Sequence, residues 1–204
     1  IYLLSCEIPQ NGGGVYSYEL TENGKLKKLR YFPCDRPMYA VKCKNGLCVL
    51  LRQPFSDTED SGYFFIDEEL NDPSKLFSTK GKCACHLTAE DSVYIANYLS
   101  GNIVKDGEEI VQRQGNSVHP ARQTAAHTHF VGVTPDDRLV VCDLGTDTLA
   151  FYDKNLRLLS EVQAPSGYGI RHLVFSADKR YIYAVNELVP SISVFAYKIG
   201  RAHV

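Results

Sequence analysis

Short runs of apolar residues alternate with polar turns along the whole chain. The runs are rich in β-branched and aromatic residues, which are the types that strands favour. No stretch keeps a sustained 3.6-residue apolar period, so we expect few helices. The pattern predicts an all-β protein built from short strands and turns.

Two segments in the C-terminal third look like copies of one pattern. One reads HFVGVTPDDRLVVCD from His129 to Asp143, and the other reads HLVFSADKRYIYAVN from His172 to Asn186. Both pairs of ends are separated by 43 residues. A period of about 40–45 residues with four strands per unit is typical of a β-propeller blade. We therefore take His129 and His172 as equivalent positions of consecutive blades.

Extending this period back to residue 1 predicts about five antiparallel blades, of which the first lacks its innermost strand and the fifth its outermost strand. The expected strands are 1–6, 15–20 and 26–31; 38–42, 47–51, 63–67 and 76–79; 86–88, 93–97, 102–105 and 108–112; 129–134, 138–143, 148–153 and 156–163; and 172–176, 181–186 and 191–197. We assign residues 1–198 to one domain. Residues 199–204, IGRAHV, resemble a translated sequencing adapter, so we expect a non-native tail there.

The composition is that of an ordinary globular protein, with 44% hydrophobic residues and a formal net charge of −2. A near-neutral balance argues against nucleic acid as the main partner. No apolar run approaches the ~18 residues that would span a bilayer. The seven cysteines are scattered through apolar runs, as free thiols of a reducing compartment are. We expect a cytoplasmic protein that binds neither nucleic acid nor a membrane.

Two charged residues break the repeat. Glu187 follows an apolar strand at the position where the preceding copy has Leu144, and Arg171 stands where that copy has Thr128. A charge in a place built for leucine costs free energy unless it has a partner or a function. We therefore interpret Glu187 as functional, whereas a structural salt bridge remains an equal alternative for Arg171.

The histidines divide by the same comparison. His129 and His172 recur in the repeat, with His86 as a looser third copy, and a recurring polar residue is more often architectural. His127 lies outside the repeat, because Ile170 takes its place in the next copy. His127 is therefore the better catalytic candidate, and we keep His129 beside it.

Several motifs, in order, resemble those of one family. Residues 119–129 read HPARQTAAHTH and resemble its RQ…HxH stretch, and residues 143–147 (DLGTD), 169–173 (GIRHL) and 185–188 (VNEL) resemble further motifs. Cys85-His86 and Ala96-Asn97-Tyr98 fit an earlier blade. Across residues 1–198 the chain resembles the lactonase family of seven-bladed β-propellers, which includes propeller-type 6-phosphogluconolactonases and a muconate lactonizing enzyme. The resemblance implies five of seven blades.

The resemblance also implies a chemistry, the hydrolysis of sugar lactones, with 6-phosphogluconolactone as the expected substrate. It places catalytic roles on His127 or His129, Arg171 and Glu187. A carboxylate or neutral imidazole would take the proton of water, and the arginine would stabilise the oxyanion. The expected substrate-binding residues are Arg122, Gln123, His86 and Asn186.

Three alternatives stay open. The same side chains could serve a muconate-type lactonizing cycloisomerase, and a propeller can also be a binding scaffold without catalysis. Asn97, Asp143 and Asn186 recur at strand ends and could offer oxygen ligands to a metal ion. An Asx residue before a turn is usually a turn device, so we expect no metal and no cofactor.

Overall fold

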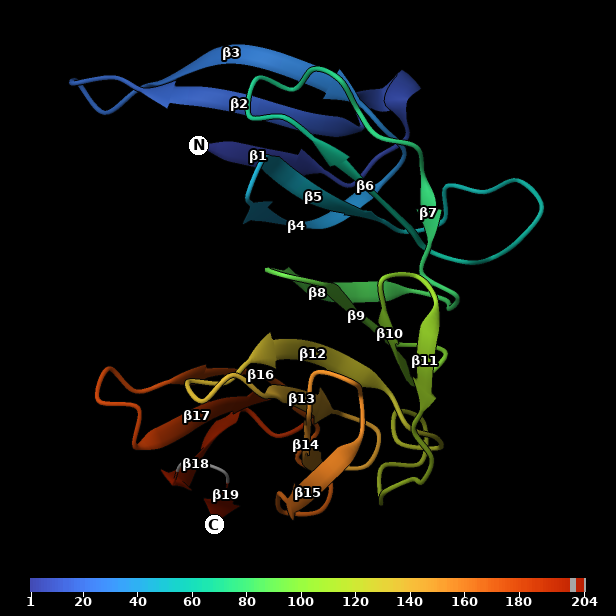
Figure 1. Ribbon diagram of the computed structural model, residues 1–204, viewed down its shortest axis with the longest axis vertical. Helices are drawn as coiled ribbons and strands as arrows, with labels where there is room; N and C mark the ends of the chain where they lie inside the picture. The colour runs from blue at the N-terminus through green and yellow to red at the C-terminus, as the bar shows by residue number, and fades with distance from the viewer. Residues whose placement is uncertain (199–200, 204) are drawn as a thin grey trace.

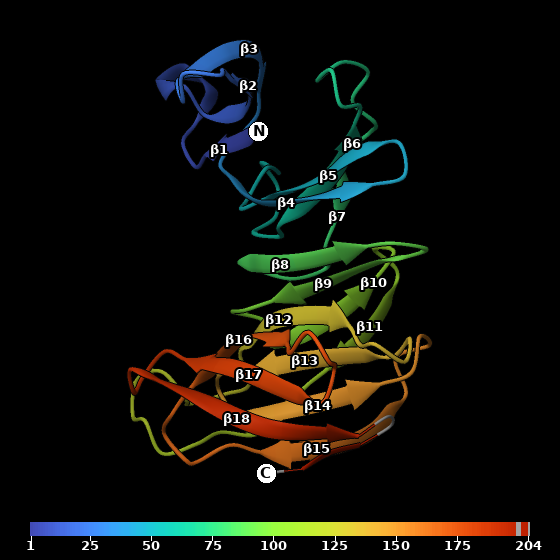
Figure 2. The ribbon, with the colours of Figure 1, turned by 90° about the vertical axis from the view of Figure 1, so that its left-hand side faces the viewer.

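Five small antiparallel sheets make up the computed structural model, which describes residues 1–198 and 201–203. Figures 1 and 2 show the first four sheets following one another from top to bottom in chain order, with the fifth beside the fourth and the two termini at opposite ends. A 3-10 turn at Pro9–Asn11 is the one helical element of the described residues. The predicted all-β architecture of propeller blades is confirmed.

Each sheet is one blade whose strands pair in chain order. The blades contain β1 (Tyr2–Ser5), β2 (Gly14–Leu20) and β3 (Leu26–Pro33); β4 (Pro37–Cys43), β5 (Gly46–Leu51), β6 (Gly62–Ile66) and β7 (Phe77–Ser78); β8 (Ala84–Ala89), β9 (Val93–Asn97), β10 (Asn102–Lys105) and β11 (Glu109–Gln112); β12 (Thr128–Val133), β13 (Leu139–Asp143), β14 (Thr148–Tyr152) and β15 (Leu158–Gln163); and β16 (Ile170–Phe175), β17 (Tyr181–Asn186), β18 (Ser191–Lys198) and β19 (Arg201–His203). Every predicted strand end lies within two residues of the observed one.

The fifth blade corrects one prediction. We expected it to lack a fourth strand, but β19 pairs with β18 through Lys198 and Arg201 at the turn. This strand falls in the segment that we interpreted as a non-native tail. Residues 199, 200 and 204 of that segment lie outside the described residues.

Each of the four innermost strands β4, β8, β12 and β16 carries a β-bulge near its start. The pairing skips one residue per strand, and the skipped residues are Met38, Cys85, His129 and Arg171. A bulge leaves one residue unpaired and turns its side chain away from the regular alternation of the strand. Four blades therefore present one extra side chain each at the same level.

The bulges also show that the predicted equivalence of His129 and His172 was wrong by one residue. His129 matches Arg171, and Phe130 matches His172. The hairpin of blade five has six residues between Phe175 and Ile182, whereas that of blade four has five between Val133 and Leu139. Equivalent residues of the first strands, such as His129 and Arg171, are therefore 42 residues apart. The extra hairpin residue brings the interval between equivalent residues of the second strands back to 43, so the sequence shows one constant period.

The core lies between the blades. Four clusters of buried apolar residues fill the four gaps between consecutive sheets. Between blades four and five, for example, Phe130 and Phe151 pack with Leu173 and Phe195. A blade cannot bury both faces alone, so neighbouring blades stabilise each other. β13 is accordingly buried on both faces, whereas β17 alternates and leaves one face exposed.

The structure also bears on the cysteines and on membrane-spanning segments. All seven cysteines are free thiols in the structure. Among the described residues, no helix is long and apolar enough to cross a membrane.

Candidate active site

The bulges and the ends of the second strands lie at the same end of the blades. In blades three, four and five, the N–H groups of Tyr98, Leu144 and Glu187 donate to the carbonyls of Cys83, His127 and Gly169 at 3.0, 3.0 and 2.8 Å. Each of these acceptors lies two residues before a bulge. The hydrogen bond therefore joins the end of each second strand to the start of the first strand, and brings their side chains to one face.

A charged cluster from two segments far apart in the sequence occupies this face. Glu187 forms ion pairs with Arg122 and with Arg171, one through each carboxylate oxygen. The Arg122 and Arg171 side chains stay 41% and 44% exposed, whereas Glu187 is 19% exposed. A half-buried carboxylate thus holds two guanidinium groups that can still be reached from solvent.

The electrostatics of Glu187 follow from this pairing. Burial alone would raise the pKa of the carboxyl group, but the hydrogen bonds and charges of Arg122 and Arg171 outweigh it and hold the pKa below its ordinary value. Glu187 is therefore ionised at neutral pH, and one negative charge is shared by two cations. An anionic group of a ligand would find net positive charge here.

Tyr98 connects this cluster to His127. Its hydroxyl accepts a hydrogen bond from Arg122 at 3.1 Å, and its ring stacks on the His127 ring at 4.6 Å with an angle of 15°. His127 Nδ1 lies 2.9 Å from the Tyr98 carbonyl oxygen. Because a carbonyl only accepts, Nδ1 carries a proton, so Nε2 is the ring nitrogen that can act as an acceptor. The site thus contains an imidazole with a fixed orientation.

His129, the bulge residue of blade four, lies edge-on to Tyr98 at 5.7 Å. Burial, and after it the charge of Arg171, lower the pKa of His129 to about 4, so its ring is neutral at pH 7. Its Nδ1 is buried and has no hydrogen-bond partner among the described residues. His129 lines the site, but its Nδ1 makes no bond like that of His127 Nδ1 to the Tyr98 carbonyl.

The other residues expected to bind substrate occupy different places. Gln123 is 0% exposed, and its amide bonds the Leu144 carbonyl at 2.9 Å and the His119 N–H at 3.0 Å. It therefore holds the Arg122 loop and offers no surface to a ligand. Asn186 is 3% exposed and donates to the hydroxyls of Ser191 and Ser193. Both amides are therefore buried and hydrogen-bonded within the protein.

His86 belongs to a stack of rings that runs across the inner strands. It packs between Tyr39 and Phe130 at 4.4 Å each and meets His172 edge-on at 5.0 Å. Burial, and after it the proximity of His172, lower the pKa of His86 to about 3. The tyrosine, phenylalanine and histidines occupy equivalent positions of four blades, one residue after each bulge. His86 is thus buried in this stack rather than in contact with the charged cluster.

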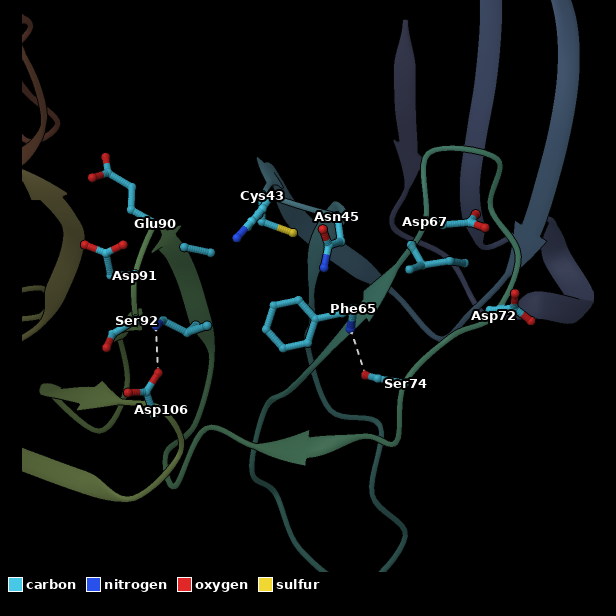
Figure 3. A pocket seen from close by; sticks show the side chains of 14 residues that line it. Cys43, Asn45, Phe65, Asp67, Asp72, Ser74, Glu90, Asp91, Ser92 and Asp106 are labelled. Atoms are coloured by element: carbon cyan, nitrogen blue, oxygen red, sulfur yellow. Dashed lines mark hydrogen bonds between the residues drawn. The ribbon is translucent and has the colours of Figure 1, made fainter.

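A pocket of about 450 Å³ lies between blades two and three, at the end of the strands opposite to the charged cluster. The labelled side chains in Figure 3 come from the ends of β4 and β6, from the turns after β4, β8 and β10 and from the segment after β6. Carboxylates dominate its polar lining, among them Asp67, Asp72, Glu90, Asp91 and Asp106. None of the residues predicted to act on substrate lines it, and its charge is unfavourable for an anion.

Of the oxygen atoms considered for a metal, the buried Oδ1 atoms of Asn97 and Asn186 have no hydrogen-bond partner among the described residues. Asn97 donates to Asn102, and Asp143 accepts a hydrogen bond from Arg113. Among the described residues, no group of three or more His, Cys, Asp or Glu side chains is arranged to hold a metal ion.

The sequence matches a known family over nearly its whole length. The model for the lactonase family of 7-bladed β-propellers matches residues 2–203. Two similar proteins of Lactococcus lactis, both described as uncharacterized, are each 33% identical to this chain over 196 and 204 residues. These alignments cover 87% and 90% of this chain but 54% and 59% of the relatives. The chain therefore spans little more than half the length of the curated relatives that it matches.

Solved structures share the fold. A Bacteroides fragilis protein provisionally assigned as a 6-phosphogluconolactonase superposes with a TM-score of 0.85 at 24% identity, covering 99% of this chain and 65% of its own. A Lactobacillus plantarum protein gives 0.85 at 26% identity, with 98% and 64% covered. The periplasmic gluconolactonase PpgL of Pseudomonas aeruginosa gives 0.81 at 24% identity, with 99% and 66% covered. The five blades thus correspond to about two thirds of a complete propeller.

Proposed function

Because this chain belongs to the lactonase family of seven-bladed β-propellers, we propose that the complete propeller hydrolyses sugar lactones, with 6-phosphogluconolactone as the preferred substrate. The observation that carries the proposal is the cluster of Arg122, Arg171 and Glu187 beside the oriented His127 ring. Lactone hydrolysis needs a base for water and a cation for the developing oxyanion. Both kinds of group lie on one face of the blades.

His127 is the proposed general base. Its Nε2 lone pair takes a proton from water while the water oxygen forms a bond to the lactone carbonyl carbon. The ring cannot turn freely, because it is bonded through Nδ1 and stacked on Tyr98. The imidazolium then returns the proton to the ring oxygen as the C–O bond breaks, which yields the open hydroxy acid.

Arg171 is the proposed oxyanion stabiliser. Its guanidinium keeps a fixed positive charge and donates to a developing negative oxygen without losing a proton. Glu187 holds Arg171 and Arg122 in place through its two oxygens. Arg122 would bind the anionic tail of the substrate, since guanidinium groups match phosphate geometry.

The test is the rate of 6-phosphogluconolactone hydrolysis by the complete propeller, measured against the spontaneous reaction. Arg171→Ala and Glu187→Gln should each lower kcat/KM by about 10²–10³-fold. Both should change the free energy of unfolding by only about 1 kcal/mol or less per ion pair, because these pairs are partly exposed. Arg180→Ala, which removes the exposed Arg180–Asp178 pair of the same blade, is the matched control.

Two outcomes would contradict the proposal. One is a wild-type protein that does not accelerate lactone opening, which would favour a binding scaffold. The other is full turnover by both site variants. Product analysis with a muconate separates hydrolysis from lactonizing cycloisomerisation, and a lower KM for the phosphorylated lactone than for glucono-lactone would support the anion site.

A further inference from the structure

The turn between β13 and β14 contacts both segments that carry the site arginines, and Asp147 makes the central contacts. Asp147 is 0% exposed. Its Oδ1 accepts a hydrogen bond from Gly169 N at 2.5 Å, and its Oδ2 accepts from Gly167 N at 2.7 Å and from Ser117 Oγ at 2.5 Å. A buried carboxylate is costly unless hydrogen bonds compensate it. These three donors come from two loops that are far apart in the sequence.

One loop leads to Arg171. Gly169 lies two residues before the bulge, and its own carbonyl accepts the Glu187 N–H at 2.8 Å. Its φ of +66° is a conformation that glycine tolerates, and a Cβ there would lie 2.6 Å from Leu188 Cγ. The bond from Asp147 therefore fixes the backbone from which both Arg171 and Glu187 project.

The second loop leads to Arg122. Ser117, whose hydroxyl donates to Asp147, closes this loop through its N–H, which donates to the Gln123 carbonyl at 2.9 Å. Arg122 lies inside the closed segment. The same loop is held from its other side by Gln123, whose amide bonds the Leu144 carbonyl of the same turn.

We propose that Asp147 is a positioning residue that sets the separation of Arg122 and Arg171, so that a single anion can contact both. Oδ1 bonds only the Arg171 loop, through Gly169, whereas Oδ2 bonds both loops, through Gly167 and Ser117. The part of this inference that concerns the positioning of substrate rests on the proposed function. Its structural part, the common tether of two arginines, is independent of the reaction.

The chemistry of the acceptor makes the role testable with an isosteric change. Asn at position 147 has one acceptor oxygen and one NH₂ donor, so it cannot satisfy three donors that converge on two oxygens. Asp147→Asn leaves at least one buried N–H or O–H facing another donor. Ser117→Ala removes a single link, that to the Arg122 loop, from a partly exposed residue. Ser117→Ala therefore tests the same role if the Asp147→Asn variant folds poorly.

The first experiment uses the complete propeller without substrate and records the NMR signals of the Arg122 and Arg171 Nε–H groups. Asp147→Asn should shift both arginine signals, and Ser117→Ala should shift that of Arg122 and leave that of Arg171 in place. The control is Asp153→Asn, whose carboxylate accepts two backbone N–H groups at 2.9 Å at the opposite end of β14. It should shift neither signal. Unchanged arginine signals in Asp147→Asn would overturn the proposal.

The second experiment measures steady-state kinetics with 6-phosphogluconolactone. Asp147→Asn should lower kcat/KM by about 10–100-fold, as expected when a distant change misplaces reacting groups, and most of the loss should appear as a raised KM. Asp153→Asn should keep wild-type kinetics. Equal kinetic losses in both variants would indicate a general loss of structure and overturn the positioning role. If the wild-type protein hydrolyses no lactone but the arginine signals still respond to Asp147→Asn, the positioning role stands and the proposed function fails.

Discussion

Replacing His86 by phenylalanine should make the protein markedly less sensitive to acid. In the native state the ring is buried between Tyr39 and Phe130, and its pKa falls from 6.5 to about 3. The unfolded chain therefore binds a proton at a pH where the native protein does not. The contribution of His86 to the free energy of unfolding is fully present above pH 6.5. It is lost as the pH falls below 6.5, until the native ring also protonates near pH 3.

The size of the effect follows from the two pKa values. The full depression corresponds to roughly 5 kcal/mol, at about 1.4 kcal/mol for each pH unit. Between pH 7 and pH 5 the His86 proton alone should cost about 2 kcal/mol of the free energy of unfolding. Phenylalanine retains the ring in the stack and binds no proton, so its variant should lack this part of the loss.

Urea unfolding of the complete propeller at pH 7, 6 and 5 measures the difference. Tyr39→Phe is the matched control, since it alters the same stack but leaves the titrating ring in place. That control should lose stability with acid as the wild type does. If His86→Phe loses as much stability as the wild type between pH 7 and pH 5, the ring is not buried in its neutral form and the reasoning fails.

Three further predictions concern the framework around the site. Gly145→Ala should destabilise the protein by about 1–3 kcal/mol, because the new Cβ would lie 1.9 Å from the Ala125 carbonyl oxygen; chemical unfolding measures this, and a neutral result would contradict the tight turn. Arg113→Met should cost about 3–5 kcal/mol by leaving the buried Asp143 carboxylate without its cation; a loss below 1 kcal/mol in the same assay would show that the pair is not needed. Residues 1–198 expressed alone should be poorly soluble, because blade five exposes Val174, Tyr183 and Ile192; a monomer with cooperative thermal unfolding would refute this.

The sequence was sufficient to locate the blades, because each strand is a β-branched or aromatic run that ends at a turn with its own chemistry. Asn45-Gly46 and Asp136-Asp137 are such turns, and the predicted strands on either side of them are the observed ones. Glu187 could be found for a related reason, since it places a charge where the repeat has Leu144. Its two arginine partners are the ones that the sequence had also singled out.

Other parts of the site could not be read from the sequence. A bulge adds a residue without changing the composition of the strand. The longer hairpin of blade five then brings the repeat interval back to 43 residues, so the shift at the bulge leaves no trace in the sequence period. Tyr98 belongs to the Ala96-Asn97-Tyr98 motif, which by itself indicates no role for the tyrosine, although it occupies the same place as Glu187 two blades earlier. Gln123 has the chemistry of a hydroxyl-binding residue, and only its complete burial shows that the amide is engaged by the backbone.

The bulge near the start of each innermost strand places one side chain on the face of the blades and outside the apolar core that joins them. The skipped residues are a thioether, a thiol, an imidazole and a guanidinium at Met38, Cys85, His129 and Arg171. None of these four side chains belongs to the apolar clusters between the sheets. One blade can therefore exchange its contribution to the face without a change in these apolar clusters. The chemistry of this face can thus change one position at a time.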